Sequence, residues 1–162
     1  MHSKSTVGKA RAPRFWLMKS EPDAFAITDL QRVGQEPWSG VRNYQARNFM
    51  RDDMRIGDRV LFYHSNAHPS GVAGLAEVAT TSYPDPTQYD SRSDYFDATA
   101  TAAGPRWFLV DLRFVRAFPQ TLALDLLRQQ PELADMLLFQ RSRLSVQPVE
   151  KRHYDRIVQL GS

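Results

Sequence analysis

The chain has 162 residues and a formal net charge of +3, with 42% hydrophobic and 24% charged side chains. These proportions are typical of one folded domain and exclude wholesale disorder. The absence of cysteine excludes a disulfide framework, cysteine-ligated zinc, iron–sulfur clusters and thiol catalysis. No apolar run approaches the ~20 residues of a membrane helix, and the N-terminus lacks the apolar segment of a signal peptide. We therefore expect a cytoplasmic protein, or a nuclear one in a eukaryote, without a membrane partner.

Charge is concentrated in a few segments. Residues 1–14 contain basic but no acidic side chains and show no hydrophobic periodicity, which predicts a flexible basic tail before a single domain over 15–162. Within the domain, the pattern predicts a basic face and an acidic face, unless these are simply solvated surface charges. The two basic segments hold Arg42, Arg47, Arg51, Arg55 and Arg59, and Arg141, Arg143, Lys151, Arg152 and Arg156; the acidic one holds Asp85, Asp90, Asp94 and Asp97.

The first third of the domain predicts one strand and two short helices. The expected elements are a strand over 15–19, a helix over 27–33, a turn over 37–40 and a helix over 44–53. Thr28 is the expected N-cap of the first helix, and Gly34 ends it. Asn43 is the expected N-cap of the second helix.

The middle of the chain predicts strands separated by irregular segments. The expected elements are a strand over 59–65, a loop over 66–71, an antiparallel partner strand over 72–81 and a strand over 107–114. Gly74 indicates a bulge or a close backbone approach inside the partner strand. Residues 85–105 predict no regular element. So long an irregular stretch in a compact domain is either functional or mobile.

The last part of the chain predicts mainly helices. The expected elements are helices over 121–130 and 132–139, divided by Pro131, a strand over 144–147 and a helix over 150–160. There is no repeat and no regular alternation of strands and helices. Antiparallel strands with peripheral helices predict an α+β fold, in which a small open or closed barrel would protect the edges of the short strands.

Several kinds of catalytic or cofactor site are excluded by the motifs. The sequence has no glycine-rich phosphate loop, no HExxH and no GxSxG. His64 and His68 are four residues apart but lie in a strand and a loop, so the spacing does not place two imidazoles on one helix face. Asp52 and Asp53 are adjacent on a helix and point apart, which disfavours paired-carboxylate catalysis. We expect neither a metal nor a cofactor.

The positive signal is a set of aromatic residues beside hydrogen-bonding residues at strand ends and turns. Trp16 precedes Lys19-Ser20, Trp38 precedes Arg42-Asn43, and Tyr63 precedes His64-Ser65. Aromatic faces stack on planar ligands, and polar groups read a ligand's edge, so the pattern is typical of nucleobase binding. In the alternative interpretation, Trp16 and Tyr63 are core aromatics and His64 is satisfied by a backbone carbonyl.

Four motifs, in order, resemble those of the EVE-domain family. They are residues 15–22 (FWLMKSEP), 38–48 (WSGVRNYQARN), 57–65 (GDRVLFYHS) and 143–149 (RLSVQPV). The second and fourth are the most specific. The stretch 97–105 departs from the family, which usually approaches the Trp107 strand by a shorter route.

The resemblance implies a PUA-like fold, a small β-barrel of mostly antiparallel strands wrapped by short helices. It also implies a pocket that receives a flipped, modified base. The pocket residues implied are Trp16, Lys19, Ser20, Trp38, Val41, Asn43, Tyr63, His64, Ser65, Leu144, Ser145 and Gln147. Arg42, Arg47 and Arg143 are the expected phosphate contacts, although an internal ion pair is the alternative for Arg47.

These observations predict a non-enzymatic, monomeric reader of a modified base in DNA or RNA. A nuclease, helicase or modification enzyme is the expected kind of partner protein. One alternative is an enzyme, or a subunit of one, that modifies or restricts nucleic acid, for which His64 and Glu21 are the only candidate acid–base groups. Another alternative is a small-molecule or protein-interaction module, for which an acid-lined pocket without a basic rim would be evidence.

Overall fold

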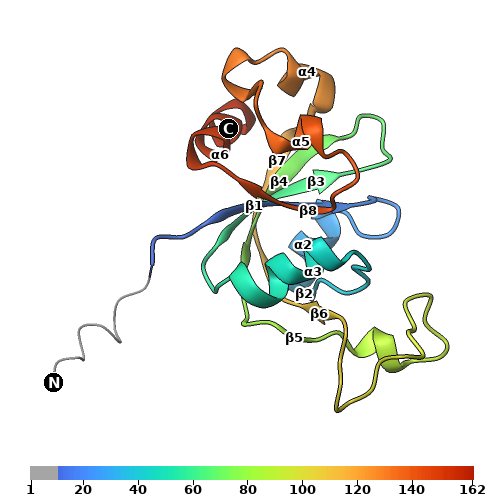
Figure 1. The fold of residues 1–162 in the computed structure, drawn as a ribbon. Helices are drawn as coiled ribbons and strands as arrows, with labels where there is room; N and C mark the ends of the chain where they lie inside the picture. The colour runs from blue at the N-terminus through green and yellow to red at the C-terminus, as the bar shows by residue number, and fades with distance from the viewer. Residues whose placement is uncertain (1–10) are drawn as a thin grey trace, which may run out of the picture.

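The fold is built on one curled six-stranded sheet that forms a half-barrel (Figure 1). The computed structural model describes residues 11–162. The strands, in spatial order, are β2 (Gln35–Pro37), β7 (Asp111–Ala123), β4 (Gly71–Val78), β3 (Arg59–His64), β1 (Phe15–Ser20) and β8 (Val146–Val149). Every pairing is antiparallel except the one between β1 and β3. The predicted α+β fold with mostly antiparallel strands is confirmed.

Short helices cover the two ends of this sheet. At one end lie α4 (Leu124–Arg128), the turn η3 (Pro131–Leu133), α5 (Leu137–Gln140) and α6 (Lys151–Gly161); toward the other lie α2 (Ile27–Val33), α3 (Tyr44–Asn48) and the π-turn η1 (Phe49–Asp53) (Figure 1). Below α3, a second small sheet of β5 (Tyr83–Pro84) and β6 (Phe108–Leu109) closes an excursion that begins with the turn η2 (Pro86–Tyr89).

Both faces of the central strands are buried, which explains their continuous apolar runs. Side chains alternate between the faces of a strand. On β1, Trp16 and Met18 enter one hydrophobic cluster, together with Trp38, whereas Phe15 and Leu17 enter the other. The first cluster packs beneath α2 and α3, and the second beneath the C-terminal helices.

The structure corrects several local predictions, among them the helix over 132–139, which is replaced by the turn η3 and the short helix α5. Strand β7 continues to Ala123, where a helix beginning at Thr121 was expected, because Leu122 pairs with Val72 of β4. Pro37 ends a short strand rather than beginning a turn. The N-cap of α2 is Ala26, not Thr28.

Other local predictions hold. Asn43 caps α3 by accepting a hydrogen bond from the backbone N–H of Ala46 at 2.9 Å. The β3–β4 register shifts beside Gly74, and a side chain at Gly74 would overlap the carbonyl oxygen of Arg116. The predicted bulge and the predicted close approach therefore both occur at Gly74.

The first described residues contact the domain. The Arg11 guanidinium pairs with Asp58 at 2.8 Å, and the Arg14 backbone N–H donates to the same carboxylate at 3.1 Å. Asp58 also accepts from the Trp16 indole at 3.0 Å. Burial acts to raise the pKa of Asp58, but these hydrogen bonds outweigh it and hold the pKa below its ordinary value. The rest of the predicted basic tail, residues 1–10, lies outside the described residues.

Within the described part of the chain, no helix is both long and apolar enough to span a membrane.

Candidate functional site

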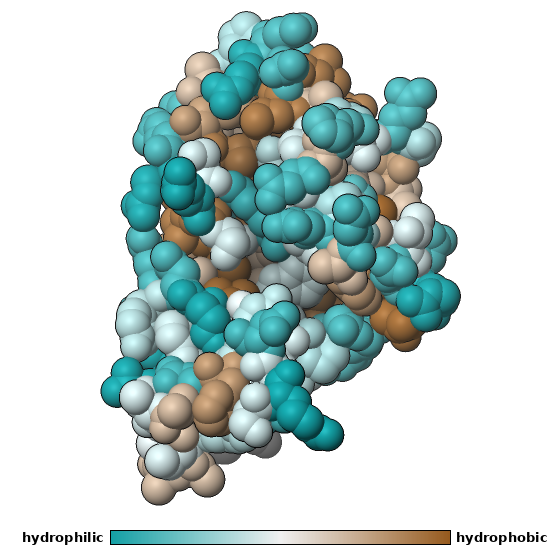
Figure 2. All heavy atoms as spheres, turned by 90° about the vertical axis from the view of Figure 1, so that its right-hand side faces the viewer, coloured by the Kyte–Doolittle hydropathy of each residue, from teal (hydrophilic) through white to brown (hydrophobic). Residues whose placement is uncertain are grey.

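A cleft of about 440 Å³ opens where β1 and β2 end, beside the loop over residues 38–42. Six of the residues predicted for binding line it: Lys19, Ser20, Trp38, Val41, Arg42 and Ser145. The space-filling view shows a mostly hydrophilic face, with paler and hydrophobic side chains in recesses at its centre (Figure 2). The structure therefore brings together parts of three motifs that are far apart in the sequence.

Trp38 forms a preorganised apolar part of this cleft. Its indole meets Phe62 edge-on at 5.4 Å between ring centroids and Phe25 at 6.3 Å. Its backbone N–H donates to the carbonyl of Val110 at 2.9 Å. The side chain is only 8% exposed, so the core fixes its position and a limited part of the indole is open to a ligand.

The polar lining combines two cations, Lys19 and Arg42, with carboxylates and hydroxyls. Lys19 Nζ donates to the carbonyl of Ser142 at 2.6 Å and lies over the Tyr63 ring; partial burial lowers the pKa of Lys19. Ser20 Oγ donates to the carbonyl of Phe25 at 2.6 Å. Glu36 also lines the cleft, and within residues 11–162 its carboxylate has no hydrogen-bond donor.

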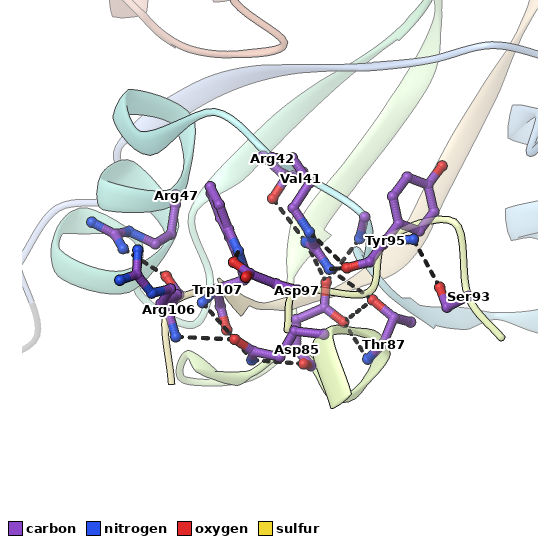
Figure 3. Close-up of polar contacts among 12 residues, drawn as sticks. Val41, Arg42, Arg47, Asp85, Thr87, Ser93, Tyr95, Asp97, Arg106 and Trp107 are labelled. Atoms are coloured by element: carbon purple, nitrogen blue, oxygen red, sulfur yellow. Dashed lines mark hydrogen bonds and ion pairs between the residues drawn. The ribbon is translucent and has the colours of Figure 1, made fainter. Parts of the chain in front are cut away.

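Arg42 joins the cleft to the excursion between β5 and β6 (Figure 3). It donates to Asp85 at 3.2 Å, to Thr87 Oγ1 at 3.0 Å and to the carbonyl of Tyr95 at 2.7 Å. Its guanidinium also lies 5.4 Å from the Tyr95 ring centroid and 5.2 Å from the Trp107 ring centroid. All three guanidinium nitrogens have internal acceptors, which favours a positioning role for Arg42 over the predicted phosphate contact.

Asp85 is the buried partner of Arg42. It is 1% exposed and accepts hydrogen bonds from the Gly40 backbone N–H at 2.8 Å and from Thr87. Burial acts to raise the pKa of Asp85, but the hydrogen bonds from Thr87, Gly40 and Arg42 lower it below its ordinary value. The predicted acidic face is therefore not a separate surface at this position, because its first carboxylate neutralises an arginine of the first basic segment.

Further hydrogen bonds organise the predicted irregular stretch. The fully buried Gln88 donates to the carbonyls of Asp85 and Trp107 and accepts from the backbone N–H groups of Arg106 and Trp107. Asp97 accepts from Thr99 and from the Trp107 indole, which lowers the pKa of Asp97 to about 2. The excursion is thus tied to the start of β6 by side chains that it supplies itself.

Arg47 is also engaged internally. It donates to the carbonyl of Arg106 at 2.6 Å and to the side chain of Asn48 at 2.8 Å, and it lies 4.7 Å from the Tyr44 ring centroid. These acceptors are neutral, so Arg47 forms an internal brace, but not the ion pair that the sequence left open.

Three predicted pocket residues are buried away from the cleft. Trp16 is 2% exposed and hydrogen-bonded to Asp58. Tyr63 belongs to the hydrophobic cluster beneath the C-terminal helices. Gln147 donates to the carbonyls of Arg141 and Leu144. Their positions favour the core interpretation of these side chains.

His64 and Ser65 are not among the residues that line the cleft. His64 Nε2 accepts a hydrogen bond from the Ile27 backbone N–H at 3.1 Å, which satisfies a free donor at the start of α2. The sequence suggested a carbonyl as the partner of His64; the structure provides an N–H instead. Partial burial lowers the pKa of His64, in keeping with a neutral imidazole that acts as an acceptor. The Ser65 backbone N–H pairs with the carbonyl of Ser20.

The remaining predicted residues surround a neighbouring hollow of about 270 Å³. Asn43, Arg143 and Leu144 line it with Ser142, whose carbonyl binds Lys19 of the main cleft. Arg143 is exposed, and its guanidinium has no acceptor within residues 11–162. Arg143 is therefore the predicted phosphate contact that is free to meet a ligand.

The cleft lining also contains residues that the sequence reasoning did not predict for the site, and Glu36 and Tyr95 are two of them. Glu36 lies in a segment where no strand was expected. The alternation of side chains along β2 could therefore not be used to predict which face Glu36 occupies. Tyr95 comes from the irregular excursion. The pair Tyr95-Phe96 within a polar stretch was the signal available, but its position near Trp38 depends on long-range pairing.

Within residues 11–162, one cluster of possible metal ligands lies outside the cleft. Oxygen and nitrogen atoms of Asp135, Glu150 and His153 lie within 4.8 Å of one another. Arg152 pairs with both carboxylates, and His153 Nε2 lies 2.8 Å from Asp135 Oδ1. These groups are therefore already satisfied by one another.

The fold and the motif residues together are those of a PUA-like domain. Residues 14–160 match the EVE domain, so the chain belongs to the EVE-domain family. It is 37% identical to thymocyte nuclear protein 1 of Homo sapiens over 164 residues, which is 90% of this chain and 72% of that protein.

Two solved structures extend the comparison. A hypothetical protein from Leishmania major has 48% identity and a TM-score of 0.91, with 94% of this chain and 97% of that chain covered. The human THYN1 protein, in complex with DNA that contains 5-methylcytosine, has 36% identity and a TM-score of 0.86, with 92% and 98% covered.

Proposed function

We propose that this chain is a non-enzymatic reader that binds a modified base, extruded from DNA, in the cleft beside Trp38. The observation that carries the proposal is the likeness to the human THYN1 protein, whose structure contains 5-methylcytosine DNA. The cleft supports it independently, because it combines an aromatic edge with polar groups in a space of about 440 Å³. Nucleobases are planar ligands that need both kinds of contact.

The lining favours a cytosine-type base. Cytosine presents an exocyclic amine as a donor and carbonyl and ring-nitrogen acceptors. The unpaired Glu36 carboxylate is a suitable acceptor for the amine, and Lys19 is a suitable donor to the opposite side of the ring. Val41 and Trp38 supply apolar surface for a methyl group.

Affinity and selectivity then follow from separate contacts. Extrusion of a base costs a few kcal/mol of unstacking, and aromatic stacking offsets this by about 1–3 kcal/mol per base. An apolar slot for a methyl group discriminates by about 10–200-fold. Selection for a 5-methyl group is therefore expected to be moderate, with most of the binding energy common to all cytosines.

The hydrogen bonds of the two candidate acid–base groups favour a binding protein over an enzyme. His64 accepts from the Ile27 backbone N–H, and Glu21 accepts from the Asn66 side chain at 2.9 Å. Each is thereby committed to a structural hydrogen bond. If the cell uses this reader in modification or restriction, a nuclease, helicase or modification enzyme would supply the chemistry.

The role of Glu36 is tested by binding of labelled oligonucleotides that carry one 5-methylcytosine, in DNA and in RNA. Glu36→Ala should weaken binding by about tenfold or more, because a hydrogen bond to a charged group contributes about 1.5–3 kcal/mol. Asp125→Ala is the matched control, since it removes an exposed carboxylate that does not line the cleft. Removal of a negative charge alone should strengthen binding to DNA slightly.

A gain in affinity for both variants would contradict the proposed role of Glu36. Equal binding of the DNA and RNA oligonucleotides would broaden the proposed function to both kinds of nucleic acid.

A further inference from the structure

The excursion between β5 and β6 presents two exposed aromatic rings, one in the lining of the cleft and one at the next position of the chain. Tyr95 lines the cleft and is 45% exposed. Phe96, the next residue, is 43% exposed and belongs to neither hydrophobic cluster of the domain. Adjacent exposed apolar side chains beside a cleft are one feature of surfaces that contact a ligand.

The backbone that carries these rings is held on both sides. The Tyr95 carbonyl accepts from Arg42 Nη2 at 2.7 Å and from Arg42 Nε at 3.1 Å (Figure 3). The backbone N–H of Asp97 donates to the carbonyl of the buried Gln88 at 3.0 Å. Phe96 lies between these two anchors, so less conformational entropy is lost when its ring meets a ligand.

The two rings are not equivalent. The Tyr95 ring packs against Gly40, where an added Cβ would lie 2.7 Å from it, and the guanidinium of Arg42 lies over its face. Tyr95 is therefore part of the cleft wall. For the Phe96 ring, residues 11–162 provide neither an aromatic nor a cationic partner.

A base that leaves a duplex creates a vacancy in the stack. Proteins that distort DNA commonly insert an apolar side chain such as Phe between base steps, and base extrusion is easier when unstacking is compensated. We propose that Phe96 is the side chain that enters this vacancy, while the cleft holds the extruded base. The inference rests on the proposed function of the cleft and adds to it a residue that selects duplex DNA.

If Phe96 fills this vacancy, its contribution to binding depends on whether the DNA is a duplex or a single strand. A single strand has no base pairs on either side of the vacancy that need a replacement stacking partner. Phe96 should therefore contribute to binding of a modified base in duplex DNA and contribute little when the same base lies in a single strand. A cleft-wall residue contributes in both cases.

The experiment compares four proteins on one DNA sequence, with and without the modified base, as a duplex and as a single strand. They are the full chain, Phe96→Ala, Tyr89→Ala and Trp38→Phe. Tyr89 is the matched control, because it is a similarly exposed aromatic residue of the same excursion and does not line the cleft. Trp38→Phe reports on the cleft itself. Thermal unfolding of each variant establishes that it is folded.

We expect Phe96→Ala to weaken duplex binding by about five- to 150-fold, the range for loss of one stacking contact. Single-strand binding should stay within about twofold, and Tyr89→Ala should match the parent on both. Equal effects of Phe96→Ala on both DNA forms, or no effect on either, would overturn the role of Phe96 while a loss in Trp38→Phe still supports the cleft. If the parent does not distinguish modified from unmodified DNA and Trp38→Phe binds as the parent does, the proposed function fails, and this inference with it.

Discussion

Gly40 shows how one residue of the second motif serves the cleft. Its φ of +86° lies in the region that glycine adopts at little cost. Its missing side chain also leaves room for the Tyr95 ring, 2.7 Å from where a Cβ would lie. Gly57 has a similar φ of +92°, but nothing lies within 4 Å of its Cβ position. The same substitution at both glycines therefore separates the cost of backbone strain from the effect of displacing the Tyr95 ring.

Gly40→Ala and Gly57→Ala should both lower thermal stability, because a left-handed conformation costs an L-residue roughly 1–2 kcal/mol. Only Gly40→Ala should also weaken DNA binding, since it displaces Tyr95 from the cleft wall. Thermal unfolding and oligonucleotide titrations of the two variants test this. Unchanged binding by a folded Gly40→Ala variant would show that Tyr95 does not form part of the ligand site.

His64 predicts a specific pH dependence of stability. Its folded-state pKa is lowered from 6.5 by burial, so the unfolded chain binds a proton more readily than the folded one. Stability contributed by neutral His64 is therefore present above pH 6.5 and is lost as the pH falls below that value. In His64→Gln, whose amide oxygen can also accept from Ile27, denaturant titrations between pH 7.5 and 5.5 should show a smaller loss than the parent. The same slope in both proteins would contradict the assignment.

At the scale of elements, the sequence predicted the strands and helices whose signals are local. Strand β1 and helix α3 follow from an apolar run and from an Asn N-cap. The boundary between β7 and α4 was wrong, because pairing of Leu122 with Val72 overrides the helical preference of residues after Thr121. The excursion gave no local signal for its backbone structure, because buried Gln88 and Asp85 organise it through contacts with Trp107 and Gly40.

Asp85 should stabilise the excursion more than the exposed carboxylates of the excursion do. Asp85→Asn leaves hydrogen-bond donors of Arg42, Gly40 and Thr87 facing an amide group, and each unsatisfied buried donor costs about 1–3 kcal/mol. Asp90→Asn is the control, because its ion pair with Arg92 is exposed and should contribute at most ~1 kcal/mol. Limited proteolysis within residues 90–104 should be faster in Asp85→Asn only. Equal cleavage of both variants would show that this network does not hold the excursion.

At the scale of the whole molecule, about half of the charged side chains within residues 11–162 form ion pairs in the fold. Exposed ion pairs such as Arg113–Glu77 and Lys151–Asp155 leave fewer free cations than the sequence suggests. Position in the fold, rather than local charge density, therefore decides which arginines can meet phosphate. The motifs identified the cleft walls at Trp38 and Lys19, but burial and internal acceptors, which no spacing reveals, distinguish free from committed side chains.

Salt dependence should distinguish these arginines. Each phosphate contact contributes about −0.7 to the slope of log affinity against log salt for a single strand. Arg143→Gln should therefore make the slope less steep by about 0.7, whereas Arg47→Gln should leave it unchanged because Arg47 is engaged by Arg106 and Asn48. Titrations at several salt concentrations test this. A change for Arg47→Gln without one for Arg143→Gln would reverse the assignment.

The proposed function requires that the cleft beside Trp38 reads a modified base. It is tested most directly by the ratio of dissociation constants for two DNA duplexes that are identical except for one 5-methyl group on cytosine. We expect the full chain to bind the methylated duplex about 10–200-fold more tightly. Trp38→Phe should reduce this ratio without unfolding the domain; phenylalanine is chosen because alanine at a buried tryptophan would cost about 3–5 kcal/mol of stability. Equal dissociation constants for the two duplexes would contradict the account.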